Sequence, residues 1–294
     1  MKAAPLIHSR TFRCDYLSDF AVRPEDFSSA DVQAARKKIL ISTRDVDMLP
    51  ELRHLVFSLN EQYVVAGVSG SMKKLAQLAS GGDAVAQEEQ LFSDEAGRGI
   101  FAFVGLVFHK SEGYEKRQVD DTTLWGMFQK FMSPVWMNRV VEAQKAAYED
   151  VDLPMHTQEA PSVKSMGQNI RGIELYESGY DSDIQRFDEY FARAFSEKNV
   201  SFCSNLENKS DILEGEFSVA SATKSRIMQV QQKVKEEDDA KKRRAPTSRP
   251  NTLKEADRPV QDQKKKKSPF RSLWIVCAAV LVILILLMAK NIIK

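Results

Sequence analysis

The chain has 294 residues, a formal net charge of +1 at pH 7, 43% hydrophobic residues and three cysteines. Three cysteines without metal-ligand spacing argue against a disulfide-stapled domain and fit a reducing compartment. No HExxH, CxxC, GxGxxG or P-loop pattern occurs, so the sequence predicts no metal and no cofactor. A metalloenzyme or a dinucleotide-dependent enzyme is therefore not expected.

The near-neutral total conceals two regions of opposite charge. Residues 1–223 contain 24 Lys and Arg against 34 Asp and Glu, whereas residues 224–271 contain sixteen against seven. The basic region holds four prolines and has few large apolar residues after Val234, so it cannot bury enough surface to offset the chain entropy. We predict an acidic head at 1–223 followed by a disordered basic linker at 224–271.

The acidic head shows strand and helix patterns in alternation. Gly99–Phe108 is apolar on both faces, which is typical of a central strand covered on each side. Alternating apolar residues and turn residues predict the other strands, and a spacing of three to four predicts the helices. In chain order we expect a strand at Lys38–Thr43, a hairpin of Leu52–Leu59 and Tyr63–Val68, a helix at Met72–Ala79, a helical stretch at Ala84–Phe92, the central strand, a helix capped by Asp121, a helix at Val135–Tyr148, a loop at Asp152–Gly172, a helix capped by Ser182, and strands at Val200–Cys203 and Phe217–Ala220. This order predicts an α+β head in which helices pack on an antiparallel sheet.

The Gly- and Ser-rich segment between the second hairpin strand and the next helix is a candidate anion site. Backbone N–H groups at such a helix start bind anions, and lysines follow in the first turn. The segment lacks both the P-loop pattern and the Gly-x-Ser-x-Gly of a nucleophile elbow, so an ordinary turn is favoured over a ligand site. The residues concerned are Gly67, Ser69, Gly70, Ser71 and Lys73.

Two further residues could serve acid–base chemistry. His109 closes the central strand and could pair with Asp120 or Asp121 across the loop that holds Gly113. A surface histidine and a helix-capping aspartate are the more ordinary interpretation. If catalysis occurs, Ser69 is the candidate nucleophile and His109 and Asp121 are the candidate acid–base residues.

The aromatic run Trp125–Trp136 could form a docking surface for a partner. Trp, Phe and Met dominate the cores of protein interfaces, and Trp125, Phe128 and Trp136 are the candidates. Packing in the core of the head is the favoured alternative. The orientation of Trp136 depends on how the chain turns after Pro134.

The segment Leu273–Ala289 contains seventeen residues without a charge, an amide or a proline. A helix of this length spans about 26 Å, close to the hydrocarbon core of a bilayer. We expect a transmembrane helix at 272–290 with Trp274 at the interface and a short extracytoplasmic tail at 291–294. The flanking basic residues face anionic lipid headgroups and keep the head in the cytoplasm by the positive-inside rule; they are Lys264, Lys265, Lys266, Lys267 and Arg271.

These features predict a single-pass, tail-anchored membrane protein. Its cytosolic head is expected to act as an interaction, sensing or adaptor module that binds a cytosolic or membrane protein. No nucleic-acid partner is expected, because the juxtamembrane lysines are better explained by lipid headgroups. The alternative is a membrane-anchored enzyme of hydrolase type with a site near Ser69 and His109.

Overall fold

The computed structural model describes all residues except 46, 48–50, 83–85, 156–166 and 245–294. Of residues 86–88 and 242–244 it describes the backbone alone. Residues up to Ala245 form one compact unit. Its strands are β1 (Lys2–His8), β2 (Val22–Pro24), β3 (Arg53–Leu59), β4 (Tyr63–Ser71), β5 (Phe101–His109), β6 (Gln144–Ala146), β7 (Glu149–Asp150), β8 (Gln168–Ile170), β9 (Ile173–Glu177), β10 (Ser201–Cys203) and β11 (Val219–Ala222). Its helices are α1 (Ser29–Ser42), α2 (Met72–Ala79), α3 (Asp121–Met132), α4 (Tyr180–Ser196), α5 (Lys209–Leu213) and α6 (Lys224–Arg244), with short 3₁₀ turns η2 (Ala86–Leu91), η3 (Lys110–Glu112) and η4 (Ser133–Val135).

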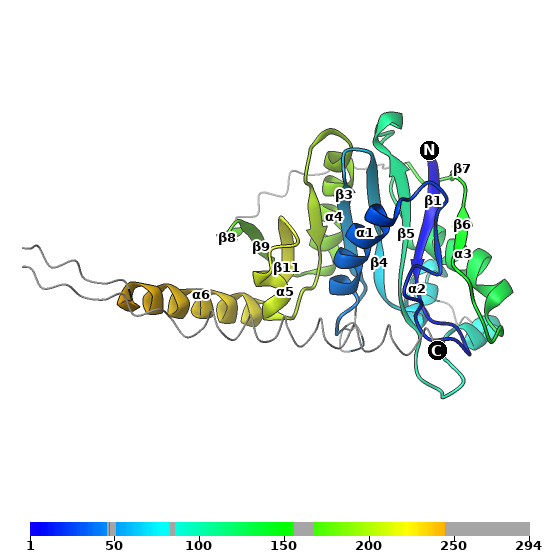
Figure 1. The fold of residues 1–294 in the computed structure, drawn as a ribbon, viewed down its shortest axis with the longest axis horizontal. Coiled ribbons are helices and arrows are strands. Elements are labelled where there is room, and N and C mark those ends of the chain that lie inside the picture. Colours follow the sequence, from blue (N-terminus) through cyan, green and yellow to red (C-terminus); the bar gives the residue numbers. More distant parts are fainter. Residues whose placement is uncertain (46, 48–50, 83–85, 156–166, 245–294) are drawn as a thin grey trace, which may run out of the picture. The chain divides into compact units, whose positions relative to one another are not determined.

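The strands form one sheet in the order β6-β2-β1-β5-β4-β3-β10-β11-β9-β8 (Figure 1). The centre is antiparallel: β3 and β4 form the predicted hairpin, and β5 pairs with β4 along its whole length. Three pairs, β2–β6, β10–β11 and β11–β9, are parallel. The α+β class is therefore confirmed, but the sheet is mixed and not antiparallel throughout.

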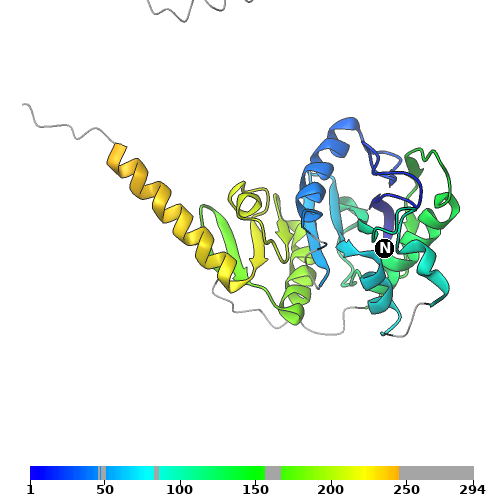
Figure 2. The same cartoon turned by 90° about the horizontal axis from the view of Figure 1, so that it is seen from below.

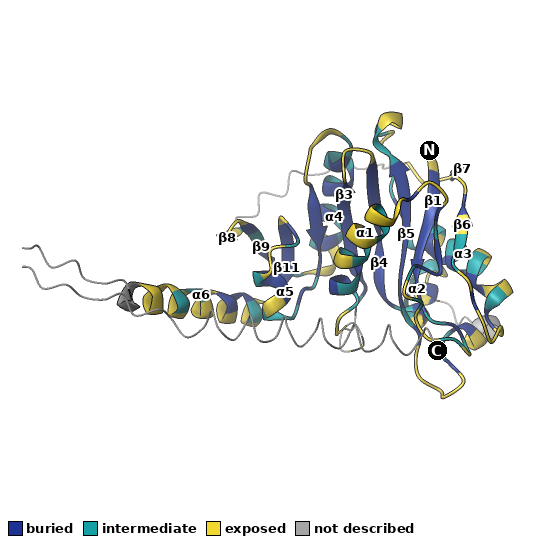
Figure 3. Ribbon diagram, viewed as in Figure 1, coloured by how far each residue is buried: buried dark blue, intermediate teal, exposed yellow. Residues whose placement is uncertain are grey.

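Helices cover both faces of the sheet and divide the core into two layers. One layer contains apolar side chains from α2, α3 and α4, and the other contains side chains from α1, α5 and α6. Neighbouring residues on β3 face opposite layers: Val56 belongs to the first and Leu55 to the second. The central strands are buried along nearly their whole length, as Figure 3 shows by their dark colour. This double covering explains why the central strands are continuously apolar.

Several predicted elements have a different structure. Part of the expected loop at 152–172 forms β8, and α4 begins after Gly179 and not at a Ser182 cap. The expected strand at 38–43 lies in α1, because Ser28 and Asp31 form a capping box that starts a helix ten residues earlier. The expected helix at 135–148 is replaced by η4 and the extended strands β6 and β7. Strand β6 pairs with β2, and β7 pairs with the start of β1. Pairing with distant strands therefore overrides local helical spacing.

Helix α6 corrects the expectation that the disordered linker begins at residue 224. Ile227 and Val230 are buried against the second core layer, and Arg171 forms ion pairs with Glu237 at 2.8 Å and Asp238 at 3.5 Å. The helix projects from the sheet in both ribbon views (Figures 1 and 2). The remainder of the predicted linker, 245–271, lies outside the described residues.

The described residues do not include the expected membrane helix at 272–290, with Leu273, Trp274 and Ala289, or the tail at 291–294. They do not include the basic residues 264–267 and Arg271 either. Within the part of the chain that is described, no helix is both long enough and apolar enough to cross a membrane.

Candidate functional site

Ser69, the candidate nucleophile, is fully buried in β4. Its hydroxyl lies 2.7 Å from the hydroxyl of Ser42, which donates to the carbonyl oxygen of Ile39 at 2.8 Å. Ser69 therefore ties β4 to the last turn of α1. A hydroxyl enclosed in this way has no surface that a substrate can reach.

The residues of the candidate anion site do not form an exposed turn, because β4 continues to Ser71. A Cβ atom at Gly67 would lie 2.3 Å from the carbonyl oxygen of Val104, so this glycine permits close contact between strands. A Cβ atom at Gly70 would lie 2.6 Å from the Leu52 side chain. Ser71 precedes α2 without a side-chain capping bond, and Lys73 is exposed. The two glycines serve packing, so the segment is not the open turn that the expected anion site requires.

His109 does have a carboxylate partner, but the partner is Asp26 and not Asp120 or Asp121. The distance from His109 Nε2 to Asp26 Oδ2 is 3.3 Å, and both side chains are about one-third exposed. Asp120, and not Asp121, caps α3 by accepting a hydrogen bond from the backbone N–H of Thr123. Asp121 is the first residue of α3, and burial, followed by the charge of Asp120, raises its pKa to about 6.

Two tyrosines complete the cluster around His109. Tyr63 donates a hydrogen bond to Asp26 Oδ2 at 3.0 Å, and the Tyr148 ring lies 4.2 Å from the His109 ring. Burial, together with the bond to Asp26, raises the pKa of Tyr63 to about 12, so its phenol stays neutral at physiological pH. Burial and the charge of Asp26 also raise the pKa of Tyr148. The arrangement orients His109 through Asp26 and supplies a neutral hydrogen-bond donor beside it.

Ser69 and His109 cannot belong to one site. Tyr63 pairs with His109 at one end of the β4–β5 ladder, and Ser69 pairs with Phe103 six residues away along it. At about 3.3 Å per residue, the two side chains are separated by roughly 20 Å along the sheet. The Asp26–His109 cluster, with Tyr63 and Tyr148, is therefore the candidate acid–base site, without Ser69.

The aromatic candidates for partner binding lie in the core. Trp125, Phe128 and Trp136 are 7%, 0% and 2% exposed. The Trp136 indole N–H donates to the carbonyl oxygen of Gln90 at 2.7 Å, and the rings of Trp125 and Phe128 stack at 5.5 Å. The three side chains pack in the core, as the favoured alternative expects, and present little surface to a partner.

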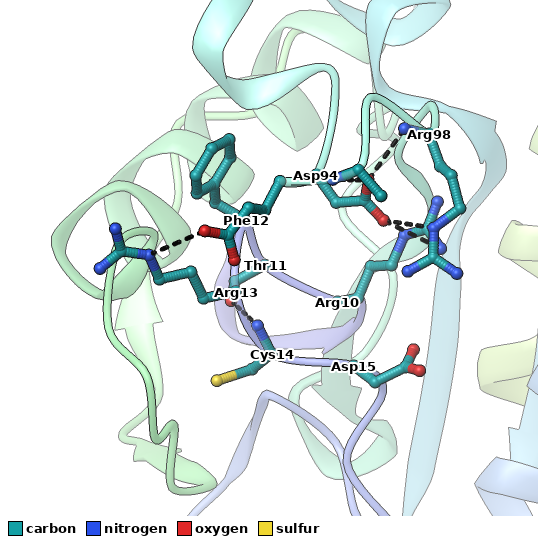
Figure 4. Close-up of a pocket in the computed structure, with 10 residues that line it drawn as sticks. Arg10, Thr11, Phe12, Arg13, Cys14, Asp15, Asp94 and Arg98 are labelled. Carbon is teal, nitrogen blue, oxygen red and sulfur yellow. Dashed lines mark hydrogen bonds and ion pairs between the residues drawn. The ribbon is translucent and has the colours of Figure 1, made fainter.

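A hollow of about 350 Å³ lies between the loop after β1 and the loop before β5 (Figure 4). Asp94 lines it and accepts hydrogen bonds from the backbone N–H groups of Ala96 and Arg98 and from Arg98 Nε at 2.7 Å. Arg10 lies 3.5 Å from the same carboxylate and donates to the carbonyl oxygen of Gly99. Burial alone raises the pKa of Asp94, but the bonds from Arg98 outweigh it and hold the pKa below its usual range. Asp94 and the two arginines therefore hold the two loops together, and their charges pair largely with one another.

Asp26, Tyr63 and Tyr148 were not predicted as site residues. Asp26 follows β2, and Tyr148 lies between β6 and β7, so both approach His109 only through strand pairing across the sheet. Their spacing in the chain carries no motif. The one local signal is that His109 ends an apolar strand next to charged residues.

No protein-family model matches this chain, and the searches of curated proteins and of solved structures give no match either.

Proposed function

We propose that this chain is a single-pass membrane protein whose head is a binding and sensing module at the cytoplasmic surface of the bilayer. The apolar segment 273–289 supplies the anchor. The preceding lysines 264–267 and Arg271 supply contacts with anionic headgroups, worth about 1 kcal/mol each near the surface. The head supplies contact with a protein partner.

The observation that carries this proposal is the way in which α6 leaves the head. Its first turns are anchored by Ile227 and Val230, whereas from Lys235 onwards nearly every described side chain is exposed. Figure 3 shows this change from a mixed to an exposed surface along the helix. A docked helix that becomes fully polar suits a connection between a folded head and a linker, because it fixes where the linker begins. Ser69 and His109, the candidate catalytic residues, lie far apart on the sheet, and this separation favours binding over catalysis.

The anchor is tested by fractionation of cells that express the full chain, Val280→Arg or Val280→Leu. Arg at the centre of a membrane helix costs about 2.5–3.5 kcal/mol, whereas Leu is favourable. We expect Val280→Arg to leave the membrane fraction and Val280→Leu to remain in it. Equal retention of both variants would contradict the proposal.

The binding function is tested by crosslinking in the native membrane. The full chain is compared with a version that ends at Arg271 and with Val280→Arg. A discrete protein that is captured only by the anchored head supports the proposal. Capture of the same set of proteins by all three forms would contradict a role for the anchor.

A second candidate function is acid–base catalysis at His109, which the 3.3 Å contact with Asp26 favours. Hydrolysis of p-nitrophenyl acetate by the full-length protein provides a first assay. If the cluster is catalytic, His109→Gln lowers turnover by about 10²-fold or more, and Ser69→Ala leaves turnover unchanged when the protein remains folded. Equal rates for the wild type and His109→Gln would exclude hydrolysis of this ester at His109.

A further inference from the structure

A second cavity lies at the far end of the sheet from His109, between β9 and helices α4 and α6. Its volume is about 460 Å³, within the range of small-ligand sites. It lies where β9 extends beyond its edge partner, because β8 pairs only with Ile173–Leu175 and leaves the last residues of β9 without a partner from β8. The cavity is lined by Gln168, Leu175, Tyr176, Glu177, Ser182, Arg186, Lys224, Ile227, Met228 and Gln231.

Arg186 is the unusual residue of this cavity. It is only 4% exposed, and its guanidinium carbon lies 3.2 Å from the centre of the Tyr176 ring. Its Nε atom is buried without a hydrogen-bond partner among the described residues. Buried arginines in proteins are normally hydrogen-bonded, because an unmet charged donor is costly. The missing acceptor is therefore expected to come from a ligand in the cavity.

The charges around Arg186 limit what that ligand can be. Asp183, one turn earlier on α4, is 2% exposed and lies close enough to interact with the Arg186 charge. Lys224 adds a second positive charge to the lining, and Glu177 adds a negative one. The four charges balance, so one additional negative charge is accommodated more readily than two. The apolar side chains of Leu175, Ile227 and Met228 suit an organic body.

We propose that this cavity binds a small organic acid through a single carboxylate held by Arg186. The planar guanidinium presents two parallel N–H donors that match the two oxygens of a carboxylate. Stacking on Tyr176 keeps the guanidinium plane fixed, which lowers the entropy lost on binding. Because α6 supplies Lys224, Ile227, Met228 and Gln231, the ligand contacts the helix that leads to the linker. The proposal does not depend on whether the chain is anchored in a membrane.

The test is isothermal titration of the full-length protein, in a non-ionic detergent, with acetate, benzoate, benzamide and inorganic phosphate. We expect saturable binding of at least one carboxylate, tighter than that of uncharged benzamide and of phosphate. Arg186→Met should weaken this binding about tenfold or more, and Arg186→Lys should weaken it less, because charge remains but the fork is lost. Arg193→Met is the matched control and should bind as the wild type does, because Arg193 lies on the same helix but outside the cavity lining and is paired with Glu189 and Glu197.

A pair of variants on α6 tests the same cavity without changing Arg186, in case the Arg186 variants do not fold. Both Gln231 and Gln232 are exposed, but only Gln231 lines the cavity, whereas Gln232 bonds to Glu236. Gln231→Trp should fill the cavity and abolish binding, while Gln232→Trp should retain it. Carboxylate binding that survives both Arg186→Met and Gln231→Trp would overturn the proposal. The absence of saturable carboxylate binding, or tighter Arg186-dependent binding of phosphate, would overturn it as well.

Discussion

Gly67 in β4 lies directly opposite Gly105 in β5, and a Cβ atom at Gly67 would lie 2.4 Å from the Gly105 Cα atom. The two central strands therefore approach each other at a point where neither residue has a side chain. From the sequence alone, Gly67 is expected to belong to an anion-binding turn. The structure instead gives it a role in the close packing of β4 against β5.

Gly67→Ala is expected to destabilise the head by about 2–3 kcal/mol, because the neighbouring contact is backbone and cannot rotate away. Gly126→Ala is the matched control. Gly126 lies within α3 with open space around it, so alanine should stabilise the head by about 0.5–1 kcal/mol through helix propensity. Urea unfolding followed by circular dichroism measures both changes. The same sign for the two variants would contradict the close-packing role.

Arg53 is expected to be a major structural arginine. It is 1% exposed and donates to the carbonyl oxygens of Ser42, Arg44 and Asn205 at 2.7–3.1 Å. Arg53→Met leaves these acceptors without a donor and should lower the free energy of unfolding by about 3 kcal/mol. Arg193→Met removes an exposed ion pair and should cost less than about 1 kcal/mol. Comparable losses in the two variants would refute the assignment.

His54 should make the head less stable in mild acid. Burial lowers its pKa from 6.5 to about 4 in the folded state. Between about pH 6.5 and pH 4 the unfolded chain therefore binds a proton that the folded chain does not, so stability falls as pH falls, by about 1.4 kcal/mol per pH unit. Burial raises the pKa of Asp183 to about 6 and that of Asp188 to about 7, which acts in the opposite direction.

Because the aspartates are common to both proteins, the difference between the wild type and His54→Leu isolates the histidine. When the pH is lowered from 6.5 to 4.5, the wild type should lose about 2–3 kcal/mol of unfolding free energy relative to His54→Leu. Above pH 7.5 the difference should be constant. Parallel stability curves across the acid range would show that His54 does not titrate in this way.

Val230 should hold α6 to the head. It is fully buried, so Val230→Ala is expected to cost about 1–3 kcal/mol and to expose the helix to proteases at its many lysines and arginines. Met228, one position from the buried stripe, is 60% exposed, so Met228→Ala should change stability by less than about 0.5 kcal/mol. Limited trypsinolysis of the full-length protein distinguishes the two. Unchanged cleavage of α6 in Val230→Ala would mean that the helix is held by other contacts.

Local patterns were sufficient for the middle of the head. The hairpin β3–β4, the helix α2, the central strand β5 and the helix α3 follow from alternation, helical spacing and turn residues, and each occurs close to its predicted bounds. Strands β2, β6, β7, β8 and β9 were missed because they have only two to five residues, and β1 was missed because it carries Pro5 in its middle. Such strands are defined by their pairing partners, and partners distant in the chain leave no periodic signal.

The candidate sites depended on tertiary structure to a greater degree. His109 was identified from its place at the end of a strand, but Asp26 lies 83 positions earlier in the chain and reaches it only through the sheet. Nothing in the sequence around Arg186 distinguishes it from the half-buried Arg193 on the same helix. Its burial against Tyr176 and its missing acceptor arise from the meeting of β9, α4 and α6.

By itself the sequence determined the α+β class, the central hairpin with its helices and the presence of one long apolar segment, because these depend on composition and on periods of a few residues. Tertiary structure decided the mixed sheet, the docking of α6, the burial of Ser69 and the neighbours of His109 and Arg186. The reason is physical: hydrophobic periodicity is a property of neighbouring residues, whereas the partner of a polar side chain is chosen by how distant segments pack.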